Sequence, residues 1–92
     1  MTLKQAMEHI TAKQGFAVCF EWIDGGVLRS DHFPDTHPTW GREAGIATEE
    51  EAWDLARRFA KAMPGRVCNV YVIHAHTFTP VGGYQERMIV NR

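Results

Sequence analysis

A capped amphipathic helix in the second half of the chain is the feature that most constrains the fold. Thr48 and Glu51 have the T-x-x-E spacing of a capping box, and Pro64 followed by a glycine stops the pattern. Between these signals the apolar residues recur at helical spacing: Ala52, Leu55, Ala56, Phe59, Ala60 and Met63. A helix with one apolar stripe depends on packing for its stability, so the rest of the chain must supply a partner surface.

Strand-like segments on both sides of this helix provide such a surface. Residues 16–23 alternate between two faces and are rich in aromatics, and Asp24 before two glycines predicts a tight turn. Residues 27–33 return as a more polar strand, which suits the edge of a sheet. Residues 66–78 are β-branched and apolar on both faces, which predicts a central strand, and residues 84–90 predict a last one.

A further helix is predicted over residues 3–14. Thr2 and Gln5 form another capping box, and Gly15 is a natural C-terminal stop. The element order is then α-β-β-α-β-β. We expect an α+β fold with one four-stranded antiparallel sheet and two helices packed on one face, which leaves the other face partly open. The 92 residues have room for a single domain, residues 1–92.

Composition narrows the class of protein. A formal net charge of −1 argues against binding nucleic acid through bulk charge. No segment approaches the roughly 20 apolar residues of a membrane span, and the first residues lack the apolar core of a signal peptide.

Cys19 and Cys68 lie in apolar strand-like segments. We interpret them as reduced thiols, with a cross-strand disulfide as the alternative, and expect a cytoplasmic protein without membrane contact.

Basic residues at the end of the capped helix form the first candidate binding site. The cluster consists of Arg57, Arg58, Lys61 and Arg66. Arg29, on the preceding strand, would enlarge it. These cations either complement the helix dipole and pair with Asp54, or they meet acidic side chains or RNA phosphates of a partner.

The irregular segment 34–47 is long for so small a domain, and long loops often carry function. Trp40 lies in its middle and either fills a gap in the core or anchors a partner. Four aromatics lie in or near turns, and any two of them would be interface anchors if exposed: Phe33, Trp40, Phe78 and Tyr84.

His74 and His76 raise the possibility of a metal site. They are two residues apart on a predicted strand, so their side chains would point the same way and offer two nitrogens. A further ligand would have to come from the neighbouring loop, where the candidates are His32, His37, Asp31 and Asp35. Two surface histidines are the alternative. No nucleophile with a base, phosphate loop or oxyanion donor can be named, so we expect a protein without enzymatic activity or cofactor.

The layout resembles small proteins of phages and mobile elements, in particular the α+β anti-CRISPR inhibitors of type I surveillance complexes. The residues that carry the resemblance are the helix start 48–52, Ala56, Phe59 and Ala60, and the strand 67–73. The likeness covers most of the chain in layout and carries no motif from which binding residues can be transferred. It implies a protein that blocks a protein–RNA complex at its DNA-binding surfaces or protein joints.

The sequence therefore predicts a non-enzymatic inhibitor that binds a bacterial protein or protein–RNA defence complex. The basic cluster, Arg29 and Trp40 would provide its contacts. A small metal-binding protein using His74 and His76 is one alternative, and a small nucleic-acid-binding regulator is the other.

Overall fold

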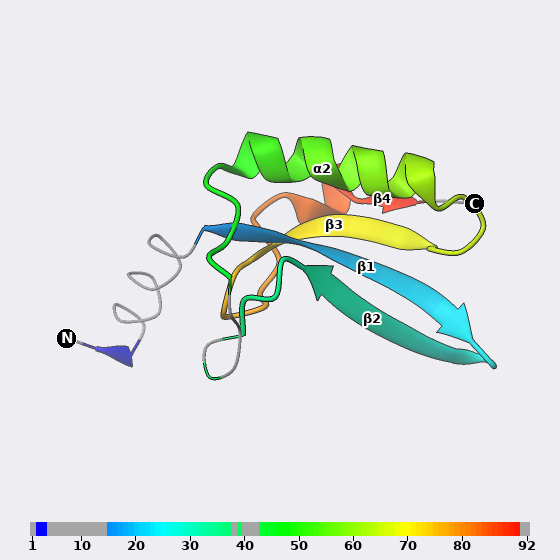
Figure 1. The fold of residues 1–92 in the computed structure, drawn as a ribbon, viewed down its shortest axis with the longest axis horizontal. Helices are drawn as coiled ribbons and strands as arrows, with labels where there is room; N and C mark the ends of the chain where they lie inside the picture. Colours follow the sequence, from blue (N-terminus) through cyan, green and yellow to red (C-terminus); the bar gives the residue numbers. More distant parts are fainter. Residues whose placement is uncertain (1, 4–14, 38, 40–42, 91–92) are drawn as a thin grey trace.

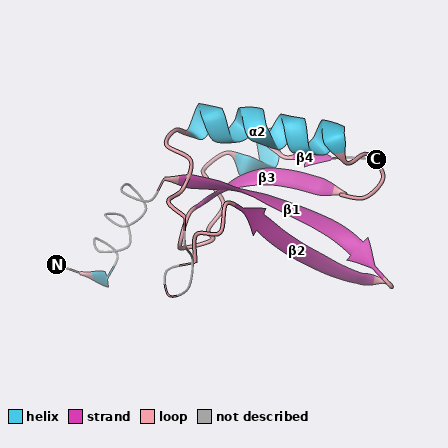
Figure 2. Cartoon of the chain, viewed as in Figure 1, coloured by secondary structure: helices cyan, strands magenta, loops and turns pink. Residues whose placement is uncertain are grey.

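The computed structural model describes residues 2–3, 15–37, 39 and 43–90. Within these residues four strands form one antiparallel sheet, and helices lie beside it, which confirms the α+β class (Figures 1 and 2). The sheet order is β2-β1-β3-β4. The elements are β1 (Phe16–Asp24), β2 (Val27–Phe33), α2 (Glu49–Ala62), β3 (Asn69–His74), α3 (Tyr84–Arg87) and β4 (Ile89–Val90).

The predicted helix over residues 3–14 lies almost entirely outside the described residues, and so does Trp40. We expected two helices on one face of the sheet. The structure shows this packing for α2, which lies across one side of the sheet in Figure 1. The second described helix, α3, is a single short turn of four residues near β4.

Helix α2 begins where the capping box places it. Thr48 has an extended backbone, and its hydroxyl oxygen accepts a hydrogen bond from the Glu51 amide at 3.2 Å. Glu49, Glu50 and Glu51 occupy the first turn, where the helix dipole favours negative charge. The helix ends at Ala62, just before Pro64 and Gly65.

The core forms where α2 meets the inner strands. Alanines at every fourth position, Ala52, Ala56 and Ala60, present a smooth stripe that lets the helix approach the sheet closely. Trp53, beside this stripe, is 1% exposed. On the sheet side, the contact is made mainly by Val18 of β1 and by Val70 and Val72 of β3, which lie on one face of the sheet. Phe59 extends the contact outward by stacking on Phe20 and touching Phe33.

The opposite face of the sheet has a smaller core of its own. Ala17, Cys19 and Ile73 are buried there, with Tyr71 packed against them. Cys19 is paired in register with His32 on one side and Tyr71 on the other, so these side chains share this face. The face was expected to be partly open, and the half-buried His32 and Tyr71 at its surface agree with that expectation.

Two strand predictions were too long. The strand predicted over residues 66–78 ends at His74, because the chain turns there: His76 and Phe78 have positive φ, and the Phe78 amide bonds back to the His74 carbonyl. The strand predicted over residues 84–90 is strand only at its last two residues. Residues 84–87 form α3 instead, after a left-handed Gly83.

Gly15 occupies a position where a side chain would collide with the backbone of a neighbouring segment. Its φ is 77°, and a Cβ at this position would collide with the Ile46 carbonyl oxygen. This close approach allows Phe16 and Ile46 to exchange two backbone hydrogen bonds, which tie the start of β1 to the segment before α2.

We expect the Thr48 cap to be measurable as stability. Thr48→Ala should lower the free energy of unfolding by about 1 kcal/mol, because the Glu51 amide loses its acceptor. Thr48→Ser is the matched control, since serine supplies an equivalent oxygen, and it should stay within about 0.5 kcal/mol of the parent protein. Urea denaturation followed by circular dichroism measures both. Equal stability of the Ala and Ser variants would contradict the role of the cap.

Candidate functional site

The predicted basic cluster lies on exposed surface at the C-terminal end of α2. Arg57 and Arg58 both pair with Asp54, at 3.6 and 3.2 Å, and all three side chains are more than half exposed. Lys61 and Arg66 are exposed as well, and no carboxylate among the described residues lies within salt-bridge distance of either. Among the described residues, Asp54 thus pairs with two of the four cations, and the end of the helix keeps an excess of positive charge.

The other residues predicted to bind a partner stand apart from this cluster or lie outside the described part of the chain. Arg29 is on β2, and its Nε pairs with Asp24 Oδ2 at 2.9 Å across the hairpin. The structure therefore engages its guanidinium in the hairpin, and a role in the helix cluster stays a prediction. Trp40 falls in the part of the loop that is not described.

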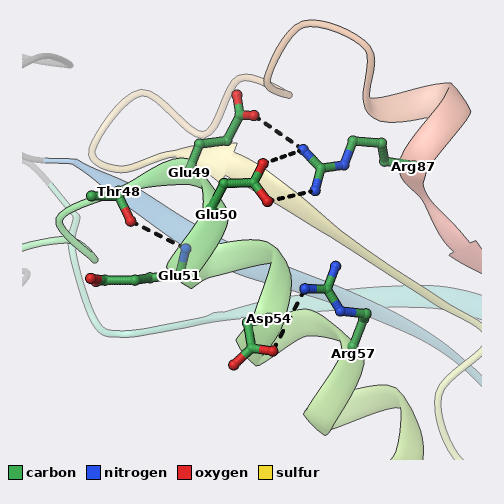
Figure 3. A network of polar contacts seen from close by, with 7 residues as sticks. All are labelled: Thr48, Glu49, Glu50, Glu51, Asp54, Arg57 and Arg87. Atoms are coloured by element: carbon green, nitrogen blue, oxygen red, sulfur yellow. Dashed lines mark hydrogen bonds and ion pairs between the residues drawn. The ribbon is translucent and has the colours of Figure 1, made fainter.

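The N-terminal end of α2 carries the opposite charge, and an arginine from a distant segment meets it (Figure 3). Arg87 of α3 donates hydrogen bonds to Glu50, at 2.8 and 3.3 Å, and to Glu49 at 3.2 Å. Its guanidinium carbon also lies 4.6 Å from the centre of the Trp53 ring. The hydrogen bond and charge of Arg87 hold the pKa of the Glu50 carboxyl below its usual value. The contact joins α3 to the helix and compensates the glutamates there.

A shallow pocket of about 260 Å³ opens on the sheet face that α2 does not cover. It is lined by Cys19, Ser30, Asp31, His32, Tyr71, Ile73 and Phe78. Phe78 reaches it from the turn after β3, where its ring contacts His32 and His37. Beside the pocket Glu21 accepts a hydrogen bond from the Asn69 amide at 3.0 Å, and the Tyr71 hydroxyl lies 3.5 Å from its other oxygen.

Two groups of this pocket, the Cys19 thiol and the Tyr71 hydroxyl, are held neutral. Burial raises the pKa of the Cys19 thiol, and the negative charges of Glu21 and Asp31 add to the shift. Burial likewise raises the pKa of Tyr71 well above its usual value. Reactive cysteines have lowered pKa values, because the thiolate is the nucleophile. The Cys19 environment therefore favours an inert thiol, and both cysteines are free rather than joined.

The histidine pair is not arranged as the predicted strand required. His74 is the last residue of β3 and contacts Phe16, whereas His76 lies in the turn with φ of 65°, so the alternation that would align them is broken. Among the described residues, no group of three or more His, Cys, Asp or Glu side chains is placed to hold a metal ion. His76 instead lies in the electrostatic range of His32 and His37.

Two residues that make the contact between α3 and α2, Arg87 and Trp53, are absent from the candidates that the sequence suggested. Arg87 was missed because its partners lie 37 and 38 positions away, and sequence spacing carries no sign of such a contact. Trp53 was left out of the predicted apolar stripe, although it is buried. The signal that could have found it is its place directly after Ala52, because the apolar face of such a helix is wider than a single row of residues.

Comparison with protein-family models, curated proteins and solved structures found no match for this chain. No helix in the described residues has both the length and the hydropathy needed to cross a membrane.

Acid should destabilise the protein through His76. Burial lowers the pKa of His76 from its ordinary 6.5, and repulsion from His37 and His32 adds to the shift. The unfolded chain then binds the proton more tightly, so the contribution of neutral His76 is present above pH 6.5 and is lost as the pH falls through the lower folded-state pKa. We expect the melting temperature to fall between pH 7 and 5, and His76→Asn to show a shallower fall. Asparagine tolerates the positive φ at this position.

Glu50→Gln is the control for this measurement. The pKa of Glu50 is lowered from an ordinary 4.5, so its contribution is lost only as the pH falls below that value. The Glu50→Gln variant should therefore show the same fall in melting temperature between pH 7 and 5 as the parent protein. If His76→Asn and the parent protein lose stability in parallel over this range, His76 is not the group responsible.

Proposed function

We propose that this chain is a non-enzymatic inhibitor that acts in the bacterial cytoplasm by binding a protein or a protein–RNA complex. Its action would be to block nucleic-acid binding or assembly, as the resemblance to anti-CRISPR inhibitors of type I surveillance complexes implies. The observation that carries the proposal is the excess of exposed cations at the C-terminal end of α2, where, among the described residues, Asp54 pairs with two of the four basic side chains.

The chemistry of these cations suits acidic side chains or phosphates. Arg57 and Arg58 present planar guanidinium groups that can bind a carboxylate or phosphate through two parallel hydrogen bonds. Lys61 and Arg66 form no ion pair with a carboxylate of the described residues. A partner that binds them would therefore not have to break an ion pair within the described part of the chain. Asp54 is the internal competitor for the other two.

The distribution of charge favours a structured partner over bulk nucleic acid. The net charge is −1, and the cations of α2 lie at the end opposite to Glu49, Glu50 and Glu51. Separated patches of opposite sign orient a partner during docking, whereas a polyanion is bound best by an evenly basic surface. A protein–RNA complex presents both acidic protein and phosphate groups, which fits such a surface.

Apolar anchors are available on both faces of the sheet: Phe33 contacts Phe59 of α2, and Phe78 lies at the pocket on the opposite face. Phe33 and Phe78 are 47% and 38% exposed, so two of the four aromatics near turns meet the condition for interface anchors. Tyr84 is half-buried and contacts Tyr71, which suits a packing role. A role for Trp40 as an anchor stays a prediction.

The test is an affinity pull-down with the tagged chain from bacterial lysate that contains a type I surveillance complex. Mass spectrometry with and without nuclease identifies what is retained. Recovery of a stoichiometric protein–RNA complex supports the proposal. Recovery of nothing by folded protein contradicts it, and so does retention of nucleic acid alone that a nuclease removes.

Charge variants test the basic surface within the same assay. Reversal at Arg58 and Lys61 to glutamate should weaken binding by about tenfold or more, and by more than alanine at both positions, because reversal adds repulsion. Asp54→Asn is the informative control: it frees Arg57 and Arg58 from their internal partner and should preserve or strengthen binding. Equal binding by the parent chain and both double variants would exclude this end of α2 from the interface.

A further inference from the structure

Strand β2 is an open edge of the sheet. It is the outermost strand, it pairs only with β1 among the described strands, and every residue in it except His32 is exposed (Figure 1). The opposite edge, β4, is two residues long. A seven-residue edge presents a row of backbone donors and acceptors that a further strand can use.

The hairpin geometry determines which backbone groups face outward. Both turn glycines, Gly25 and Gly26, have positive φ, and Asp24 and Val27 close the two-residue turn as a hydrogen-bonded pair. Hydrogen-bonded and free positions alternate along β2 from there, so the amides and carbonyls of Leu28, Ser30 and His32 face away from β1. The His32 amide agrees with this assignment, since it donates to the neighbouring Asp31 side chain at 2.7 Å.

We propose that two copies of this chain associate through their β2 strands, antiparallel and related by a two-fold axis at Ser30, to form one continuous sheet. In this register each outward-facing residue meets another: Ser30 pairs with Ser30 of the second copy, and Leu28 with His32. The Ser30 and Leu28–His32 pairs can exchange backbone hydrogen bonds, and the His32 amide then gives up the Asp31 carboxylate for the Leu28 carbonyl of the second copy. The paired segment runs the full length of β2, between the turn glycine 26 and Pro34.

The side chains are self-complementary in the same register. Arg29 comes to lie opposite Asp31 of the second copy, twice by symmetry, on the face that carries α2. Val27, which is 55% exposed, comes to lie opposite Phe33, which is 47% exposed. These are close, non-hydrogen-bonded pairs, in which side chains interact best. Opposite charges at the centre and apolar pairs at both ends match a second copy of β2 itself.

Neighbouring registers are disfavoured by the same residues. A shift of the pairing that keeps the outward groups matched places either Arg29 opposite Arg29 or Asp31 opposite Asp31. Like charges directly opposite one another destabilise a strand pair. Only the register centred on Ser30 combines full overlap with charge complementarity, so the dimer has one defined geometry.

The test is sedimentation velocity over a concentration series, at low salt. The parent chain should show a reversible species of about 21 kDa, twice the mass of the 10.5 kDa chain. Arg29→Asp and Asp31→Arg should each weaken the dimer by roughly tenfold or more, because each places like charges opposite one another. The decisive sample is an equimolar mixture of the two variants, in which both charged pairs are restored, one of them with its two charges exchanged. It should form a heterodimer although each variant alone is monomeric.

Further variants separate pairing from folding. Ser30→Pro removes the outward amide at the centre and should prevent dimerisation while circular dichroism reports a folded chain. Arg58→Asp is the matched control, an exposed arginine reversed on α2, and should dimerise like the parent. A chain that stays monomeric at millimolar concentration, or a mixture in which the variants do not recombine, overturns the proposal. The dimer interface lies on β2 and uses none of the basic side chains of α2, so dimerisation and binding through those cations are tested separately.

Discussion

The packing of α2 against the sheet is the interaction on which the other features depend. The helix approaches closely because its central stripe is alanine, and Trp53 at its edge fills the space that small residues leave. A single helix over Val18, Val70 and Val72 provides most of the buried apolar surface of so short a chain. The strands are held in order by that contact, since a small sheet without a covered face is only marginally stable in water.

The same helix divides the surface charge of the protein. Its first turn is acidic and its last turns are basic, as the helix dipole favours. Arg87 compensates the acidic end, through the contacts in Figure 3, while the basic end has only Asp54. The asymmetry arises from the tertiary contact with α3 and leaves one end of α2 available for a partner.

In the described part of the chain, the sheet offers two further surfaces, because α2 lies on one face of it. On the far face, Cys19 and Tyr71 border a shallow pocket, where burial raises the pKa of both groups and keeps them neutral. Along its side, β2 is open to a further strand. The surface of α2 and the edge of β2 are separate elements, so a pair of chains joined at β2 could present two basic helix ends to one assembly.

Local signals in the sequence were sufficient for the capped helix, the first hairpin and the α+β class, because capping residues, turn glycines and alternation act over a few positions. These signals failed after His74. The chain turns there, and residues 84–87, which were predicted as part of a strand, form α3. The position of Arg57, Arg58 and Lys61 on one helix could be predicted, since they lie within five positions of one another, and Arg66 follows shortly after the helix ends. The Arg87 contact, the position of His76 and the pocket beside Cys19 were decided by tertiary structure, because they join segments whose separation in sequence carries no information about their distance in space.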